Sequence, residues 1–130
     1  MARVAPDLPL RANLSALDNI ALIPLYQRHY SAAESNRQAR QLLEQLGHAD
    51  IALLRDPDMT AAQRFIAKLA RALILRRPRL VIDHPGAMLY DVPYPDFIRQ
   101  LAAQEEMAGT WEIYDFSWNQ TLYNQALHPE

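Results

Sequence analysis

Residues 59–85 read MTAAQRFIAKLARALILRRPRLVIDHP. Thr60, with a glutamine three residues later, forms a capping-box pattern, and apolar residues then recur at helical spacing. The arginines near residue 77 suit a helix C-terminus, and Pro78 prevents the helix from continuing. The apolar run over residues 80–82 fits a buried parallel strand with Asp83 at its carboxyl end. This stretch therefore predicts a helix over residues 60–77, followed by a strand.

Two further capping patterns lie upstream of this stretch. Ser15, with an acid three residues later, opens an apolar segment of helical period, so a helix is predicted to begin there and to end or kink at Pro24. Ser31 opens a second amphipathic segment, which Gly47 is expected to terminate. Residues 1–13 are predicted to form an extended lead-in because they carry two prolines and no helical period.

The residues after 85 predict a further helix and a further strand. A proline-rich stretch over residues 85–95 is followed by a helical pattern over 96–107 and an alternating, strand-like pattern over 110–114. The order is helices first, then strand, helix and strand, in one domain over residues 1–130. Aromatic residues gather near the C-terminus and predict a hydrophobic cap over the core; they are Trp111, Tyr114, Phe116, Trp118 and Tyr123.

Composition excludes several kinds of function. The net charge is −2, so no charge field indicates nucleic-acid binding. The chain has no cysteine, which excludes disulfides and thiolate metal sites. It has only 3 glycines, so it offers few residues from which a phosphate-binding loop could be built. No apolar run approaches membrane-spanning length, so we expect a cytoplasmic protein without direct membrane insertion. No metal-ligand spacing relates the four histidines, His29, His48, His84 and His128.

The chain resembles the ATPase subunits of ABC transporters, which carry a signature L-S-G-G-Q, a helix ending in A-R-A-L, and an apolar strand ending in D-E-P. The sequence of these segments is similar to that of ATPases in lipid-transport systems of the Mla or toluene-tolerance type. The matching segments keep the family's order; they are Asn13-Leu14-Ser15-Ala16-Leu17-Asp18-Asn19-Ile20, Met59-Thr60-Ala61-Ala62-Gln63, Ala70-Arg71-Ala72-Leu73, and Arg77-Pro78 through Asp83-His84-Pro85.

The resemblance implies an α/β fold that is mostly helical. A helical subdomain and a signature-like helix would occupy residues 14–77. A Walker-B-like strand, a helix, a second strand and an aromatic tail would occupy residues 78–130. Together the strands would form a small parallel-sheet fragment of the P-loop NTPase type. Such a fragment would leave strand edges and an apolar sheet face uncovered, so self-association is expected.

The family's ATP-contacting groups are mostly absent from the chain. No Walker A motif is present, and the single lysine, Lys68, lies in a predicted helix. Asp83 keeps the Walker B position that holds Mg²⁺, but His84 replaces the catalytic glutamate. The family's Q-loop glutamine has no counterpart, and an aspartate, Asp115, stands where the switch histidine is expected. In the signature-like segment, Thr60 and Gln63 keep the hydroxyl and the amide, whereas the two glycines are replaced by Ala61 and Ala62.

Three functional hypotheses follow from these departures. The first is a non-hydrolysing relic or regulatory component of a transport system, which keeps a surface over residues 14–30 for the coupling helix of a transmembrane subunit. The second is an ATP-binding subunit that works only in a heteromeric pair with a complete ATPase. The third is a helical protein-interaction module. We expect no hydrolysis by the isolated chain and no cofactor, with Mg-ATP bound only if a partner or an upstream segment completes the site.

Overall fold

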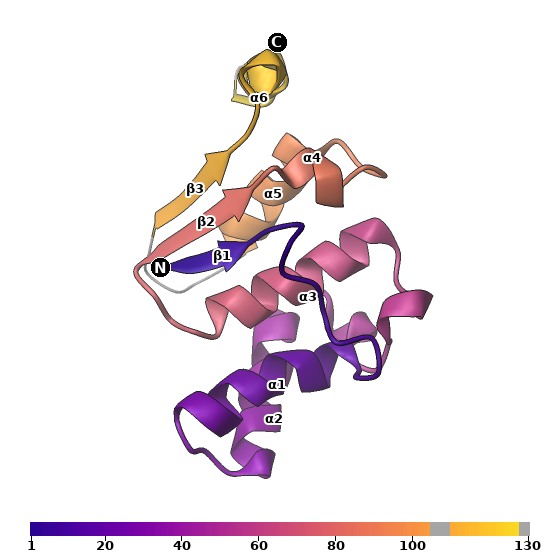
Figure 1. Ribbon diagram of the computed structural model, residues 1–130, viewed down its shortest axis with the longest axis vertical. Coiled ribbons are helices and arrows are strands. Elements are labelled where there is room, and N and C mark those ends of the chain that lie inside the picture. Colours follow the sequence, from indigo (N-terminus) through magenta and orange to yellow (C-terminus); the bar gives the residue numbers. More distant parts are fainter. Residues whose placement is uncertain (105–109, 128–130) are drawn as a thin grey trace.

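The computed structural model describes residues 1–104 and 110–127. It is a mostly helical α/β chain with a small parallel sheet, as predicted (Figure 1). The strands are β1 (Ala2–Val4), β2 (Arg79–Asp83) and β3 (Thr110–Tyr114). The helices are α1 (Ala16–Gln27), α2 (Ala32–Gln45), α3 (Ala61–Leu73), α4 (Pro85–Met88), α5 (Tyr94–Gln104) and α6 (Gln120–Leu127), and the 3-10 turns are η1 (Ala49–Ile51), η2 (Asp56–Asp58) and η3 (Ser117–Asn119).

The predicted capping residues begin the three long helices. Ser15 and Ser31 accept hydrogen bonds from backbone N–H groups three residues later, which satisfies donors left free at the starts of α1 and α2. At α3 the box is complete, because Thr60 Oγ1 accepts from Gln63 N at 3.1 Å and Gln63 Oε1 accepts from Thr60 N at 2.9 Å. Gly47 ends α2 with φ of 80°, a left-handed conformation that suits glycine.

Helix boundaries differ from the prediction at Pro24, at the end of α3 and at the start of α5, which begins at Tyr94 and not at residue 96. Pro24 lies inside α1 and does not end it, since the helix continues to residue 27 and the Pro24 carbonyl accepts from Arg28 N. Helix α3 ends at Leu73, four residues before the predicted end, and Arg76 has a left-handed backbone with φ of 56°. The predicted end of the next helix, at residue 107, lies outside the described residues.

The sheet has three parallel strands in the order β1-β2-β3. Strand β1 is a correction to the prediction, because the N-terminal residues were expected to be an extended lead-in. Arg3 lies opposite Val81, and Val81 lies opposite Glu112 on the other side. Among residues 1–104 and 110–127, β1 and β3 each pair with β2 alone, so both have an open edge.

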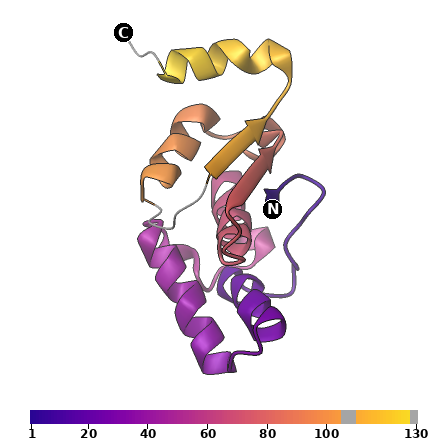
Figure 2. The same cartoon turned by 90° about the vertical axis from the view of Figure 1, so that its left-hand side faces the viewer.

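One face of the sheet packs on the helices and forms the core. Ala2, Val4, Leu80 and Ile82 join buried residues of α3 and α5 in one cluster, while the buried faces of α1 and α2 pack on α3. Figures 1 and 2 both show α1 and α2 at one end of the molecule and α6 at the opposite end, with the sheet between them. Helix α3 is therefore the central element that connects the helical subdomain to the sheet.

The opposite face of the sheet is polar, which corrects the expectation of an uncovered apolar face. Because alternate strand residues share a face, Arg3, Arg79 and Asp83 lie together with residues of β3. Arg3 Nη2 bonds Asp83 Oδ2 at 2.8 Å, and Arg79 Nη2 bonds Glu112 Oε2 at 2.7 Å. Val81 is buried between these two ion pairs. Two charged pairs from neighbouring strands therefore occupy the face that was predicted to be apolar.

The C-terminal aromatic residues form no continuous cap. Phe116 and Trp118 stack on each other with ring centroids 4.3 Å apart, yet they are 48% and 73% exposed. Tyr114 is also exposed, whereas Trp111 and Tyr123 pack against the core. The prediction is therefore correct for two of the five residues. Within the described residues, no helix combines the length and apolar composition that crossing a membrane requires.

Candidate functional site at the carboxyl ends of the strands

Asp83 lies at the carboxyl end of the central strand β2, where parallel α/β sheets place their ligands. Its carboxylate is already occupied by a cation, because Arg3 donates to Oδ2 from both Nε, at 3.1 Å, and Nη2, at 2.8 Å. The side chain of Asp83 is only 20% exposed. Arg3 and Asp83 are 80 residues apart, and the pairing of β1 with β2 brings them together.

His84 follows directly and adopts a left-handed backbone, with φ of 49° and ψ of 60°. Its N–H donates to the carbonyl of Tyr114 at 2.7 Å, which extends the contact between β2 and β3 by one bond. The imidazole lies against Phe116, with ring centroids 4.5 Å apart. These contacts give His84 a structural role at the turn into α4.

The signature-like residues are engaged at the start of α3. Thr60 and Gln63 bond to each other's backbone N–H groups in the capping box. The next donor, Ala62 N, faces Asp91 Oδ2 at 3.4 Å. A carboxylate near a helix N-terminus stabilises the helix through its partial positive charge. The position from which a phosphate would approach this helix therefore already carries a negative side chain.

Several positions that the resemblance assigns to Mg-ATP are engaged within the chain. A magnesium site needs carboxylates free to bind the metal, and Asp83 is paired with Arg3. Among the residues that the structure describes, no three histidine or acidic side chains lie together in a metal-binding group. Ala61 is buried, and both Ala61 and Ala62 add a methyl group where a glycine would allow the closest approach of backbone to phosphate.

Asp115 forms a hydrogen-bond cluster that the sequence did not indicate. It stands where the resemblance places a switch histidine, and its carboxylate accepts from Tyr94 OH at 3.0 Å, Tyr123 OH at 2.7 Å, Asn119 Nδ2 at 3.1 Å and Phe116 N at 2.7 Å. Burial alone would raise the pKa of Asp115, but these donors outweigh it and hold the pKa below its usual value. The cluster connects α5 to α6.

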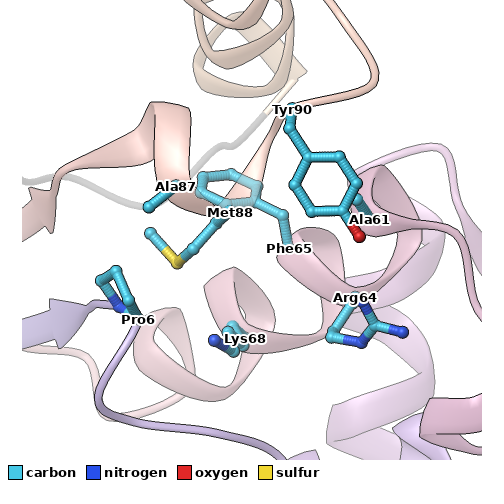
Figure 3. Close-up of a pocket in the computed structure, with 8 residues that line it drawn as sticks. All are labelled: Pro6, Ala61, Arg64, Phe65, Lys68, Ala87, Met88 and Tyr90. Atoms are coloured by element: carbon cyan, nitrogen blue, oxygen red, sulfur yellow. The ribbon is translucent and has the colours of Figure 1, made fainter.

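A pocket of about 140 Å³ lies between α3, α4 and the segment after β1 (Figure 3). Lys68, which the sequence places inside a helix, is 7% exposed and donates from Nζ to the carbonyl of Ala5 at 3.3 Å. Arg64 also lines the pocket and is paired with Asp56. Burial lowers the pKa of Lys68, and the nearby charges of Arg71 and Arg64 lower it further.

A second pocket, of about 350 Å³, lies against α1. Five of its seven lining residues fall within residues 14–30, the surface expected to meet a transmembrane subunit. Tyr26 is the most exposed of the aromatic residues there, at 70%. The lining residues are Arg11, Asn19, Leu22, Ile23, Tyr26, Gln27 and Arg71.

Comparison with known proteins relates the chain to ABC-transporter ATPases. No family model matches the chain. The thiamine import ATP-binding protein ThiQ of Haemophilus ducreyi is 22% identical over 130 residues, which cover 98% of this chain and 58% of ThiQ. The chain therefore spans little more than half the length of this relative.

Solved structures of ATP-binding cassettes share the fold. The bacterial ABC transporter cassette MJ0796, in a dimeric structure, is 25% identical with a TM-score of 0.70, and the match covers 92% of this chain and 53% of the cassette. The same cassette in a post-hydrolysis state bound to ADP and Pi gives a TM-score of 0.69. cbiO1 from Clostridium perfringens, part of the cbiONQ transporter complex, has a TM-score of 0.73 at 17% identity and 47% coverage of its own length, which shows the fold alone.

These relatives agree with the resemblance to ABC-transporter ATPases that the sequence motifs indicated. The narrower likeness to the Mla or toluene-tolerance type stays a prediction. The chain is thus ABC-ATPase-like and resembles a C-terminal portion of an ABC-transporter ATP-binding subunit.

Proposed function

We propose that the chain is a non-hydrolysing regulatory or interaction component of a transport system. The observation that carries this proposal is the pairing of Asp83 with Arg3 across the sheet. An aspartate that helps to hold Mg²⁺ must offer its oxygens to the metal. Here two N–H groups of the Arg3 guanidinium donate to the same oxygen, Asp83 Oδ2. Mg²⁺ at this oxygen would have to displace a cation that is fixed by strand pairing.

The start of α3 supports the same proposal. A helix N-terminus attracts phosphate because its N–H groups are free and its dipole is positive. The Thr60–Gln63 capping box and Asp91 engage these groups from within the chain. A phosphate at this position would meet the Asp91 carboxylate at short range, and like charges repel.

Calorimetric titration with Mg-ATP tests this proposal. We expect no binding heat and no shift in melting temperature for the wild-type chain. An Asp83→Asn variant serves as a matched control, since it should give the same flat titration. Submillimolar affinity for Mg-ATP, lost in Asp83→Asn, would overturn the proposal.

A transmembrane transporter subunit is the proposed partner, and the pocket against α1 is the proposed contact surface. The exposed ring of Tyr26 and the apolar side chains of Leu22 and Ile23 line this pocket. Interfaces use such rings as anchors. Tyr90, which is 74% exposed and lies at the other pocket, provides a matched control. Co-purification with a co-expressed transmembrane transporter subunit should weaken for Tyr26→Ala and persist for Tyr90→Ala. Equal retention of both variants would contradict the assignment.

A second candidate function is that of a subunit in a heteromeric pair with a complete ATPase. Its support is the survival of Thr60 and Gln63 at the start of a helix, on the edge that would face ATP held by the other subunit. This function predicts co-purification with a complete ATPase and a rate of ATP hydrolysis that changes when Gln63 is replaced by alanine. An unchanged rate in the mixed complex would exclude it.

Self-association is proposed through the open edges of the sheet, now that its free face is known to be polar. Strands β1 and β3 each present unpaired backbone groups on one side in the part of the chain that is described. Light scattering at micromolar concentration should give a mass above that of one chain. A mass equal to that of one chain would contradict this proposal.

We propose a cytoplasmic location for the protein, whether it is a monomer or an oligomer.

A further inference from the structure

The side chain of Lys68 is a buried cation whose hydrogen-bonding capacity is largely unused. An ammonium group has three N–H donors, and among the described residues Nζ donates only to the carbonyl of Ala5. No acidic side chain in residues 1–104 or 110–123 forms an ion pair with it. A buried charge without an opposite charge is costly, so this position favours a ligand that supplies one.

The surrounding charges have the same sign. Arg64, Lys68 and Arg71 follow at spacings of four and three residues and so share one face of α3. Arg71 donates its hydrogen bonds to the backbone carbonyls of Leu8 and Pro9, so these bonds bring no negative charge to the face. Only Arg64 has an acidic partner, Asp56.

Two further carboxylates lie near this face, and each is engaged elsewhere: Asp91 accepts from Ala62 N at the start of α3, and Asp7 faces Arg3. Asp7 is 71% exposed and forms its ion pair with Arg3, at 3.6 Å. Two cations, Arg64 and Lys68, therefore line the pocket, and none of the nearby carboxylates forms an ion pair with Lys68.

The pocket has the size of a small ion. Its volume is about 140 Å³, which is below the roughly 300–1,000 Å³ of pockets that hold drug-sized ligands. Pro6, Phe65 and Met88 form apolar walls around Lys68, and the Tyr90 ring lies at the rim with its hydroxyl toward Arg64 (Figure 3). Apolar walls lower the local dielectric constant, which strengthens the attraction between a bound anion and Lys68.

We propose that this pocket binds one small tetrahedral oxyanion of the phosphate class, with Lys68 as its principal partner and Arg64 beside it. Its principal cation is separate from the ATP-contacting positions, since Lys68 lies two helical turns beyond Thr60 along α3, although Ala61 of the signature-like segment lies at one end of the pocket. The inference does not rest on the proposed transport role, so either can fail without the other.

The chain contains a single lysine, which makes the test specific. In protein labelled with ¹³C at lysine, NMR reports the Cε signal of Lys68 alone. Titration with inorganic phosphate should shift this signal saturably and raise the pKa of Lys68, because a bound anion stabilises the charged ammonium. Sodium chloride at matched ionic strength provides the control and should give no saturable shift. A response equal to that of chloride, or an equal response to acetate, would overturn the proposal.

Variants give a second readout that does not depend on the lysine signal. Lys68→Met keeps the length of the side chain and removes the charge, so the chain should stay folded. Thermal stabilisation by phosphate should weaken as affinity falls by about tenfold or more. Arg40→Met removes one exposed positive charge on α2 and should respond like the wild type. Equal stabilisation of Lys68→Met and the wild type would overturn the proposal.

Discussion

At position 83 an aspartate stands where the resemblance places the magnesium-binding residue of ABC ATPases, while its neighbours define a different environment. Arg3 donates to its carboxylate, and the His84 ring lies against Phe116. Under the proposed function, the histidine at position 84 is one of several differences from a hydrolytic site. Restoring one residue leaves the others in place.

Replacing His84 by glutamate should consequently produce no ATPase activity. The new carboxylate would stand beside an aspartate that is paired with Arg3, and the start of α3 would still face Asp91. Phosphate release measured with excess Mg-ATP should stay at the background rate of wild type. The same assay on the triple variant Arg3→Ala, His84→Glu and Asp91→Asn, which also removes the two charged groups at these positions, is the comparison for the single variant. Turnover in the single variant would show that the glutamate alone was missing.

Asp115 is the residue whose hydrogen bonds we expect to matter most for the C-terminal segment. Replacing it by asparagine removes the charge that Tyr94 and Tyr123 donate to. Hydrogen bonds to a partly exposed charged group contribute modestly, so the free energy of unfolding should fall by about 1–2 kcal/mol. Chemical denaturation followed by far-UV circular dichroism measures this change.

Asp96 supplies the matched control for that variant. It is exposed and pairs with Arg99 one turn away, at 3.3 Å. Asp96→Asn should lower the free energy of unfolding by less than about 0.5 kcal/mol. Equal losses in both variants would show that the Asp115 cluster has no special contribution.

At the scale of single elements, the capping box of α3 gives a direct prediction. Thr60→Ala leaves Gln63 N without its side-chain acceptor, and the free energy of unfolding should fall by about 1 kcal/mol. Thr60→Ser keeps the hydroxyl and should match the wild type closely. Thermal and urea denaturation check both variants. An alanine variant as stable as wild type would show that the helix start is held by packing alone.

The sequence predicted the elements whose signals are local. Helix starts depend on a side chain and a backbone group three residues apart, so the caps at Ser15, Ser31 and Thr60 were visible as patterns. Strand β1 has only three residues, too few to show alternation, and it exists because β2 pairs with it. Helix α4 was missed for a related reason, since its Pro85 and Gly86 resemble a loop.

The candidate site was predicted only as positions along the chain. Asp83, His84 and the segment from Thr60 to Gln63 lie at the predicted ends of their elements. Their partners were not predictable, because Arg3 reaches Asp83 through strand pairing and Asp91 reaches Ala62 across 29 residues. The buried position of Lys68 likewise depends on packing between α3 and the segment after β1.

At the scale of the whole molecule, three carboxylates within the described residues have pKa values lowered by their partners, and they predict loss of stability in acid. Hydrogen bonds from Arg37 and then Gln38 lower the pKa of Glu34 to about 2. The bonds from Arg79 and then Tyr114 lower that of Glu112, and the pKa of Asp115 is also lowered. A depressed pKa contributes stability above the unfolded value, and this stability is lost as pH falls through the folded value.

The melting temperature should therefore decrease as the pH falls from about 5 toward about 2. Added salt should reduce this dependence, because Glu34 and Glu112 lie in exposed ion pairs that ions screen. A Glu34→Gln, Glu112→Gln double variant should show a shallower decrease than the wild type. A melting temperature that is constant across this range would contradict the prediction.

The ion pairs on the free face of the sheet also set a condition for building chimeras. If the nucleotide-binding half of an ATPase were joined to this chain and its helices covered this face, Arg3, Asp83, Arg79 and Glu112 would become buried. Buried charges lose hydration, which their mutual attraction repays only when the geometry and the remaining hydrogen bonds are good. Stable folding of such a chimera would need both members of a pair to be kept or converted together, since changing one member would leave its partner charged beneath the new layer.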